Sequence, residues 1–106
     1  MSESKPILRI FEVTTKPGFS GKMLESFATT SVKVVENEPG NLGYYFGQNI
    51  NEQSVMFVSV WQNLESVKNK FGKNWEESFL PEGYAEMIET HSLRHIDASF
   101  GWKVNL

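Results

Sequence analysis

Short apolar stretches separated by turn-forming residues predict four β-strands along this chain. Residues 7–15, 42–50 and 54–61 are rich in β-branched and aromatic side chains, which favour a pleated, half-buried surface. A last strand is expected at about residues 91–100. The Lys-Pro-Gly sequence at residues 16–18 ends the first stretch, because proline and glycine interrupt regular structure.

Apolar residues at helical spacing predict a helix over residues 20–37, with the serine at its start as the cap. Its apolar face consists of Leu24, Phe27, Ala28, Ser31, Val34 and Val35. A second helix is expected over residues 64–71, since Asn63 is a good N-terminal cap and the helix stops at Gly72. A further helical piece is expected at residues 82–89.

The order of these elements, strand–helix–strand–strand–helix–strand, predicts the fold. Two right-handed strand–helix–strand crossovers make one four-stranded antiparallel sheet with both helices on one face. We therefore expect an α+β, ferredoxin-like βαββαβ fold. A chain of 106 residues is expected to form one domain, residues 1–106.

The strand at residues 54–61 is apolar on both faces. One face carries Met56, Val58 and Val60, and the other carries Val55, Phe57 and Trp61. Because the helices cover only one face of the sheet, the other face needs a covering layer. A second copy of the same sheet is the simplest candidate, so we expect a homodimer, with the tail at residues 100–102 reaching the partner subunit.

Composition excludes several classes of partner. The net charge is −3 and there is no run of lysines or arginines, so nucleic acid and anionic membranes are not expected partners. No apolar run approaches the roughly 20 residues of a membrane span, and residues 1–5 have no signal-peptide core. The absence of cysteine excludes disulfides and thiolate chemistry and suits a reducing compartment. We expect a cytoplasmic protein.

Five short motifs, in this order and spacing, resemble the antibiotic-biosynthesis monooxygenase-like family of dimeric α/β-barrel proteins. They are Lys16-Pro17-Gly18, Glu38-Pro39-Gly40, Val60-Trp61, Phe71-Gly72 and Leu93-Arg94-His95. The resemblance spans about residues 7–97 and implies a homodimer with a pocket between each sheet and its helices. Some members oxidise polycyclic phenols with O2 and no metal or flavin. Others degrade haem, act on quinols or isomerise small metabolites.

The chain departs from the polar residues that these relatives use. Haem-degrading relatives have an asparagine on the first strand, a tryptophan at the end of the third and a histidine on the next helix. Here Trp61 matches, but the first strand has Ile10 or Phe11, and residues 64–90 contain no histidine. Haem degradation is therefore disfavoured. Phenol-oxidising relatives place an asparagine four residues before the tryptophan and a tyrosine six after it. This chain has Phe57 and Val67 at those positions.

Trp61 and His95 are the candidate catalytic residues, and we expect them to approach one pocket. Trp61 would be a pocket wall or N–H donor; otherwise it is a buried core ring. His95 would be the base, with a pH dependence near neutrality; otherwise it is a hydrogen-bonded structural or pocket-lining residue. A metal bound by His95, His91 and Asp97 is not expected, because alternate side chains on a strand stand ~6–7 Å apart.

Aromatic side chains elsewhere are expected to contact the substrate, and these are Phe57, Tyr45 and Trp75. Trp75, Phe79 and Tyr84 follow Gly72 and form either a lid or packing under a loop. The two arginines, Arg9 and Arg94, are expected to form ion pairs with Glu12, Asp97 or a partner subunit rather than a clamp for a substrate carboxylate.

Two classes of function remain open. The first is a cofactor-independent monooxygenase acting on an aromatic or quinone-like small molecule. In this case an electron-rich substrate reduces O2 in a dry pocket, and no metal, haem or flavin is needed. The second is a non-catalytic dimer of the same fold that binds a small ligand.

Overall fold

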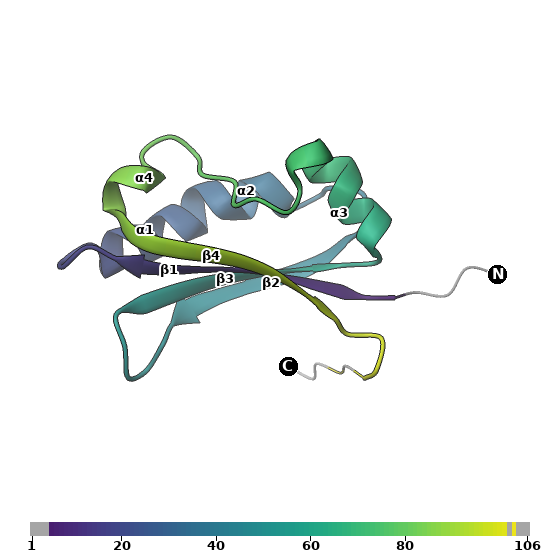
Figure 1. The fold of residues 1–106 in the computed structure, drawn as a ribbon, viewed down its shortest axis with the longest axis horizontal. Coiled ribbons are helices and arrows are strands. Elements are labelled where there is room, and N and C mark those ends of the chain that lie inside the picture. The colour runs from purple at the N-terminus through teal and green to yellow at the C-terminus, as the bar shows by residue number, and fades with distance from the viewer. Residues whose placement is uncertain (1–4, 102, 104–106) are drawn as a thin grey trace.

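Four strands form one antiparallel sheet, and helices α1 to α4 lie on the same side of it (Figure 1). The computed structural model describes residues 5–101 and 103. The strands are β1 Ile7–Thr15, β2 Asn41–Gln48, β3 Ser54–Trp61 and β4 Ile88–Asp97. Their order across the sheet is β2-β3-β1-β4, so β1 lies between β3 and β4. The predicted α+β, ferredoxin-like fold is confirmed.

The first helical segment differs from the prediction in its cap and its regularity. It consists of α1 (Ser20–Ser26), a π-helical turn (Phe27–Ser31) and α2 (Val32–Val35). The N-cap is Phe19, which makes no side-chain capping bond, so the prediction that Ser20 is the cap is wrong. The segment ends before residue 37 because the residue after α2 is already extended.

The second helix, α3 (Leu64–Phe71), agrees with its predicted bounds. The Asn63 side chain accepts a hydrogen bond from the Ser66 backbone N–H at 2.9 Å, which satisfies an otherwise unpaired amide of the first turn. Gly72 ends the helix with φ of +73°, followed by a 3-10 turn at Gly72–Asn74.

The last helix and strand are shifted from their predicted positions. The helical piece is only α4 (Tyr84–Met87), because Gly83 has a φ of +91° and cannot lie inside a right-handed helix. Ile88 is already extended and pairs with Thr15, so β4 begins three residues before the predicted start at residue 91. It ends at Asp97 rather than at residue 100.

Strand alternation decides which side chains meet the helices. The odd-numbered residues of β1 are buried against the helical layer. Arg9 lies opposite Ser59 of β3 and His95 of β4. Trp61 lies one row further along the same face, opposite Ile7. β1 therefore lies between Trp61 on β3 and His95 on β4.

Aromatic rings join the helices to the sheet in the core. Phe27 of the π turn is fully buried. Its ring meets Phe57 with centroids 5.5 Å apart and Phe11 with centroids 6.1 Å apart, both edge-on. Such edge-to-face pairs add about 0.5–1.5 kcal/mol to the burial of their area. They fix the π turn directly above the middle of the sheet.

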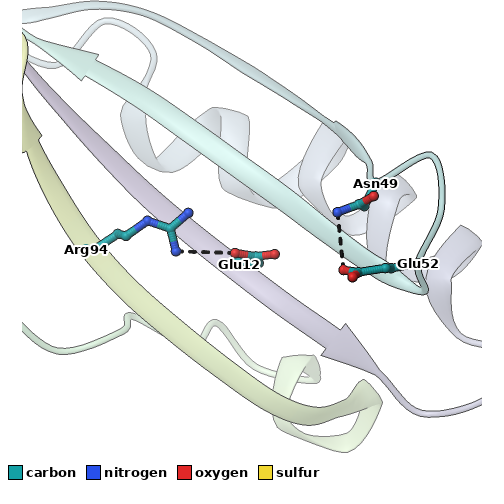
Figure 2. Close-up of polar contacts among 4 residues, drawn as sticks. All are labelled: Glu12, Asn49, Glu52 and Arg94. Carbon is teal, nitrogen blue, oxygen red and sulfur yellow. Dashed lines mark hydrogen bonds and ion pairs between the residues drawn. The ribbon is translucent and has the colours of Figure 1, made fainter.

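The other face of the sheet is not covered by helices. Its apolar residues on adjacent strands are Leu8, Ile10, Tyr45, Met56, Val58, Val60 and Ile96. One ion pair crosses this face, where Arg94 Nη1 donates to Glu12 Oε1 at 3.3 Å. Figure 2 shows these two side chains pointing toward each other, and also the contact of Asn49 with Glu52 in the β2–β3 turn. The predicted ion pair of Arg94 is confirmed.

Residues 1–4, 102 and 104–106 lie outside the described part of the chain. These include most of the N-terminal stretch considered for a signal peptide, and Trp102 of the expected partner-contacting tail. Phe100 is 95% exposed. Within the described residues, no helix has both the length and the apolar character that a membrane span requires.

Gly40 provides a test of the packing between the start of β2 and α3. Its φ is +84°, and a Cβ added there would collide with the Ser66 side chain. Ser66 cannot move freely, because both its amide and its hydroxyl donate to Asn63. We expect Gly40→Ala to lower the free energy of unfolding by about 2–4 kcal/mol, from a left-handed backbone and overpacking together.

Gly18→Ala is the matched control, because its φ is +83° but its added Cβ meets nothing within 4 Å. Gly18→Ala should lower the free energy of unfolding by only about 1 kcal/mol. Urea denaturation of both variants measures the difference. Equal losses would show that the contact with Ser66 does not constrain the turn.

Candidate functional site

A cavity lies between the helix-covered face of the sheet and the helical layer. Its empty volume is about 420 Å³, which includes space open to solvent. The apolar lining residues are Phe11, Val34, Val35, Phe57, Phe71, Phe79, Pro81 and Leu93. The polar ones are Arg9, Ser31 and Ser59. An apolar cavity with a few polar groups is the usual form of a small-molecule site.

Arg9 is a buried cation near the start of β1, with 5% of its surface exposed. Its Nη1 donates to the Trp75 carbonyl at 2.6 Å and to His95 Nε2 at 3.0 Å. Its Nη2 donates to the Glu77 carbonyl at 3.4 Å. The guanidinium carbon lies 3.7 Å from the centroid of the Phe71 ring, a cation–π contact.

These partners of Arg9 are all neutral groups. Among the described residues no carboxylate lies within ion-pair distance of it, so the predicted ion pair with Glu12 or Asp97 is wrong for this arginine. The alternative of an ion pair with a partner subunit stays a prediction. Burial lowers the pKa of Arg9 to about 10, which leaves it charged at neutral pH. The cavity is therefore next to a positive charge that no described acidic side chain neutralises.

His95 is neutral in this arrangement. Because a guanidinium only donates, His95 Nε2 must accept, and the ring proton is on Nδ1. Burial, and then the charge of Arg9, lower the pKa of His95 to about 4. The edge of its ring meets Trp75 with centroids 5.0 Å apart. The prediction of a histidine base that titrates near neutrality is wrong; this imidazole helps to hold Arg9.

Trp61 is a core ring that supports the cavity from behind. It is fully buried and packs edge-on against Phe71, with centroids 5.9 Å apart. Its indole Nε1–H donates to Ser59 Oγ at 2.8 Å. Trp61 is not part of the cavity lining, whereas Ser59 is. The N–H of Trp61 therefore acts on the cavity through the Ser59 hydroxyl.

The π turn supplies the polar group on the opposite wall, Ser31. The Tyr84 hydroxyl donates to the Ser26 carbonyl at 2.9 Å, so its single proton is used there. Ser31 Oγ lies 2.7 Å from the same tyrosine oxygen and must be the donor in that bond. Tyr84 is thus packing under the segment, whereas Phe79 lines the cavity and is 53% exposed.

A match to a family model confirms the family resemblance found in the sequence. The antibiotic biosynthesis monooxygenase model matches residues 6–71, which is more than half of the chain. The chain belongs to the antibiotic biosynthesis monooxygenase family. The match covers β1 to α3, and so it includes both Arg9 and Ser59. No curated protein sequence matches the chain at a significant level.

Solved structures share the fold at low sequence identity. The protein PA3566 from Pseudomonas aeruginosa has a TM-score of 0.69 and 13% identity, over 92% of this chain and 97% of that one. The heme-degrading protein Rv3592 from Mycobacterium tuberculosis has a TM-score of 0.67 and 19% identity, over 94% and 99%. The protein SO0527 from Shewanella oneidensis has a TM-score of 0.68 and 14% identity, over 89% and 91%. These likenesses concern the fold.

Of the side chains predicted to contact a substrate in this family member, only Phe57 lines the cavity. Trp75 does not line the cavity; its carbonyl accepts from Arg9 and its ring meets that of His95. Tyr45 is 56% exposed on the uncovered face, where it lines a separate depression with Met56 and Val58. The expectation that Tyr45 shares a site with Phe57 is therefore wrong.

Sequence reasoning missed Arg9 and Ser59 as cavity residues. Both stand at helix-facing positions on the central strands, between apolar neighbours on the same face. A polar residue within a buried alternation is the signal that indicates them. The two positions are also directly paired across β1 and β3, which the sequence alone does not show.

The cavity does not fit a haem group. An axial side chain such as histidine usually holds haem iron. Neither histidine lines the cavity: His95 Nε2 accepts from Arg9, and exposed His91 contacts Ser78 Oγ at 2.9 Å. In the part of the chain that the structure describes, no three His, Asp or Glu side chains come together as a metal site would require. The expected independence from a metal stays a prediction.

The neutral state of His95 has a consequence for stability. Its pKa is about 4 in the folded protein against a usual 6.5. As the pH falls below about 6.5, the unfolded chain takes up a proton that the folded chain refuses. We therefore expect the free energy of unfolding to fall between pH 6.5 and pH 4, and this part of the decline to disappear in His95→Gln, whose amide oxygen can still accept from Arg9.

Urea denaturation at a series of pH values measures the effect. His91→Gln is the matched control, since it removes the exposed imidazole and leaves the contact with Arg9 intact. It should keep the wild-type decline. A decline of the same size in His95→Gln would contradict this account of His95.

Proposed function

We propose that the protein binds an electron-rich aromatic molecule in this cavity and oxidises it with O2, without a bound metal, haem or flavin. The observation that carries the proposal is the cavity itself. Phe11, Phe57, Phe71 and Phe79 surround it, and the polar groups are confined to a few positions. Because the empty volume of about 420 Å³ includes open solvent, the enclosed part is smaller, and we expect a ligand of no more than one or two rings.

The proposed reaction converts a phenol and O2 into a quinone and water. One oxygen atom becomes the new carbonyl, and the other leaves as water with two hydrogen atoms from the substrate. The four electrons that reduce O2 all come from the substrate, so no other reductant is needed. The reaction starts from the deprotonated substrate, because the anion gives an electron to O2 more readily than the neutral phenol.

Ligand binding without turnover is the second candidate function. The low pKa of His95 favours it, because the cavity then lacks a base in the neutral range. The two candidates share the same aromatic cavity. They differ only in whether O2 is consumed when a suitable ligand is bound.

Oxygen consumption with a panel of naphthols and hydroquinones tests the proposed function. We expect one of these substrates to be oxidised in the presence of a strong metal chelator, with one O2 consumed per product and no hydrogen peroxide released. Val34→Trp should abolish the reaction by filling the cavity, because Val34 lines it. Lys33→Trp is the matched control on the exposed side of α2 and should keep the activity.

Binding without oxygen uptake would select the second candidate. If no member of the panel binds, or if chelators abolish the oxidation and iron restores it, the proposed function is wrong.

We further propose that the working unit is a homodimer in which the uncovered sheet faces pack together. Tyr45 and Ile96 are 56% and 41% exposed on this face, next to the partly buried Leu8 and Ile10. A face of this kind on a small domain is stabilised by burial against a second sheet. The Glu12–Arg94 ion pair lies on this face among these apolar side chains.

Light scattering at micromolar concentration measures this assembly. We expect a dimeric mass for the wild type and a monomeric mass for Ile96→Lys, because the dimer would bury an unpaired charge. Ile50→Lys is the matched control, since Ile50 is 96% exposed in the β2–β3 turn, and it should remain dimeric. A wild type that is monomeric under these conditions contradicts the proposal.

A further inference from the structure

The guanidinium of Arg9 has unused hydrogen-bonding capacity beside the cavity. A guanidinium carries five N–H groups. Hydrogen bonds to the carbonyls of Trp75 and Glu77 and to His95 use three of them. The remaining Nε–H and Nη2–H donors have no partner among the described residues, and Arg9 as a whole is only 5% exposed. Buried charges in proteins are normally paired, so the site has room for an anion that the chain itself does not supply.

Ser59 adds a second donor at the same place. It lies directly opposite Arg9 across β1 and β3, and both line the cavity. Because an indole N–H can only donate, Ser59 Oγ accepts from Trp61 and its own proton is not used in that bond. No described group accepts this proton. The hydroxyl is therefore available to donate to a ligand, and Trp61 is a positioning residue for it.

The floor of the cavity thus combines a positive charge and a hydroxyl donor with walls of aromatic rings. Ser31 on the opposite wall gives its proton to Tyr84 and offers a ligand only lone pairs. The polarity is one-sided, with donors at the sheet and an acceptor at the π turn. An aromatic ring with an anionic oxygen at one end matches this arrangement, because the oxygen meets Arg9 and Ser59 while the ring contacts Phe11 and Phe57.

We propose that the cavity binds its aromatic ligand as an anion, through the Arg9 guanidinium and the Ser59 hydroxyl. This inference rests on the proposed function, since it assumes that an aromatic ligand enters the cavity. On this proposal His95 is not needed as a base to form the reactive phenolate. The phenol releases its proton to solvent, and the protein binds the phenolate. The matching chemistry is shared by phenolates and aromatic carboxylates, and the experiment below distinguishes them.

The test uses 4-nitrophenol, whose phenol and phenolate forms differ in colour. The absorbance of the bound probe is followed against pH with the wild-type protein in excess. A positive charge at close range lowers the pKa of an acid by about 1–3 units. We expect the bound probe to titrate lower than the free probe by this amount, so that phenolate binds about 10-fold to 1,000-fold more tightly than phenol. The neutral analogue 4-nitroanisole should bind as weakly as the phenol form.

Variants assign the effect to the two donors. Arg9→Met should remove the shift in the pKa of the probe, and Arg9→Lys should retain part of it. Ser59→Ala should weaken phenolate binding by about 10-fold to 100-fold, the loss typical of one hydrogen bond to a charged group. Trp61→Phe should cause a smaller loss in the same property, because Ser59 is then less well oriented. Arg94→Met removes the other arginine, on the opposite face, and should leave the shift unchanged.

Each outcome decides between the two claims. If neither 4-nitrophenol nor 4-nitroanisole binds, the proposed aromatic site is wrong. If both bind equally and the probe titrates at its free pKa, the aromatic site stands and the anion-binding pair is wrong. The same conclusion follows if Arg9→Lys and Ser59→Ala both behave as the wild type, so the test does not depend on Arg9→Met folding. Tighter binding of 4-nitrobenzoate than of nitrophenolate would support the anion site and overturn the phenolate as its ligand.

Discussion

The buried guanidinium of Arg9 is the interaction on which the candidate site depends. It lies on the central strand of the sheet and holds backbone carbonyls of the segment after α3 as well as the ring of His95. A charge in this position is costly unless its N–H groups are satisfied. The neutral acceptors around Arg9 satisfy part of the guanidinium and fix the segment that carries Phe79 and Pro81 over the cavity. Arg9 therefore both holds the segment on one side of the cavity and provides the positive charge on the other.

Trp61 and His95, the candidate catalytic residues of the sequence, are both supporting residues in the structure. His95 is kept neutral by burial and by the adjacent charge, so it serves as an acceptor and not as a base. Trp61 is fully buried and uses its N–H on Ser59. In both cases the chemistry reaches the cavity through a neighbour on β1 or β3. Membership of the antibiotic biosynthesis monooxygenase family fits a cavity of this kind but does not assign its substrate.

Much of the fold could be predicted because its signals are local. Runs of β-branched and aromatic residues give β1 and β3 with their observed bounds, and the cap at Asn63 and the glycine at residue 72 give α3. The π turn could not be predicted, since Phe27–Ser31 has the same apolar spacing as an ordinary helix. The partners of Arg9 could not be predicted either. Two of them are the backbone carbonyls of Trp75 and Glu77 in an irregular segment, and a backbone carbonyl gives no signal in the sequence.

A crystal structure with 4-nitrophenolate bound tests the central claim most directly. On this account the phenolate oxygen lies within about 2.7–3.2 Å of both the Arg9 guanidinium and Ser59 Oγ. The ring then lies against Phe11 and Phe57, between the sheet and the π turn. The account would be contradicted if the probe occupied the depression beside Tyr45 on the uncovered face. It would be contradicted equally by a probe in the cavity whose oxygen points away from Arg9 toward solvent.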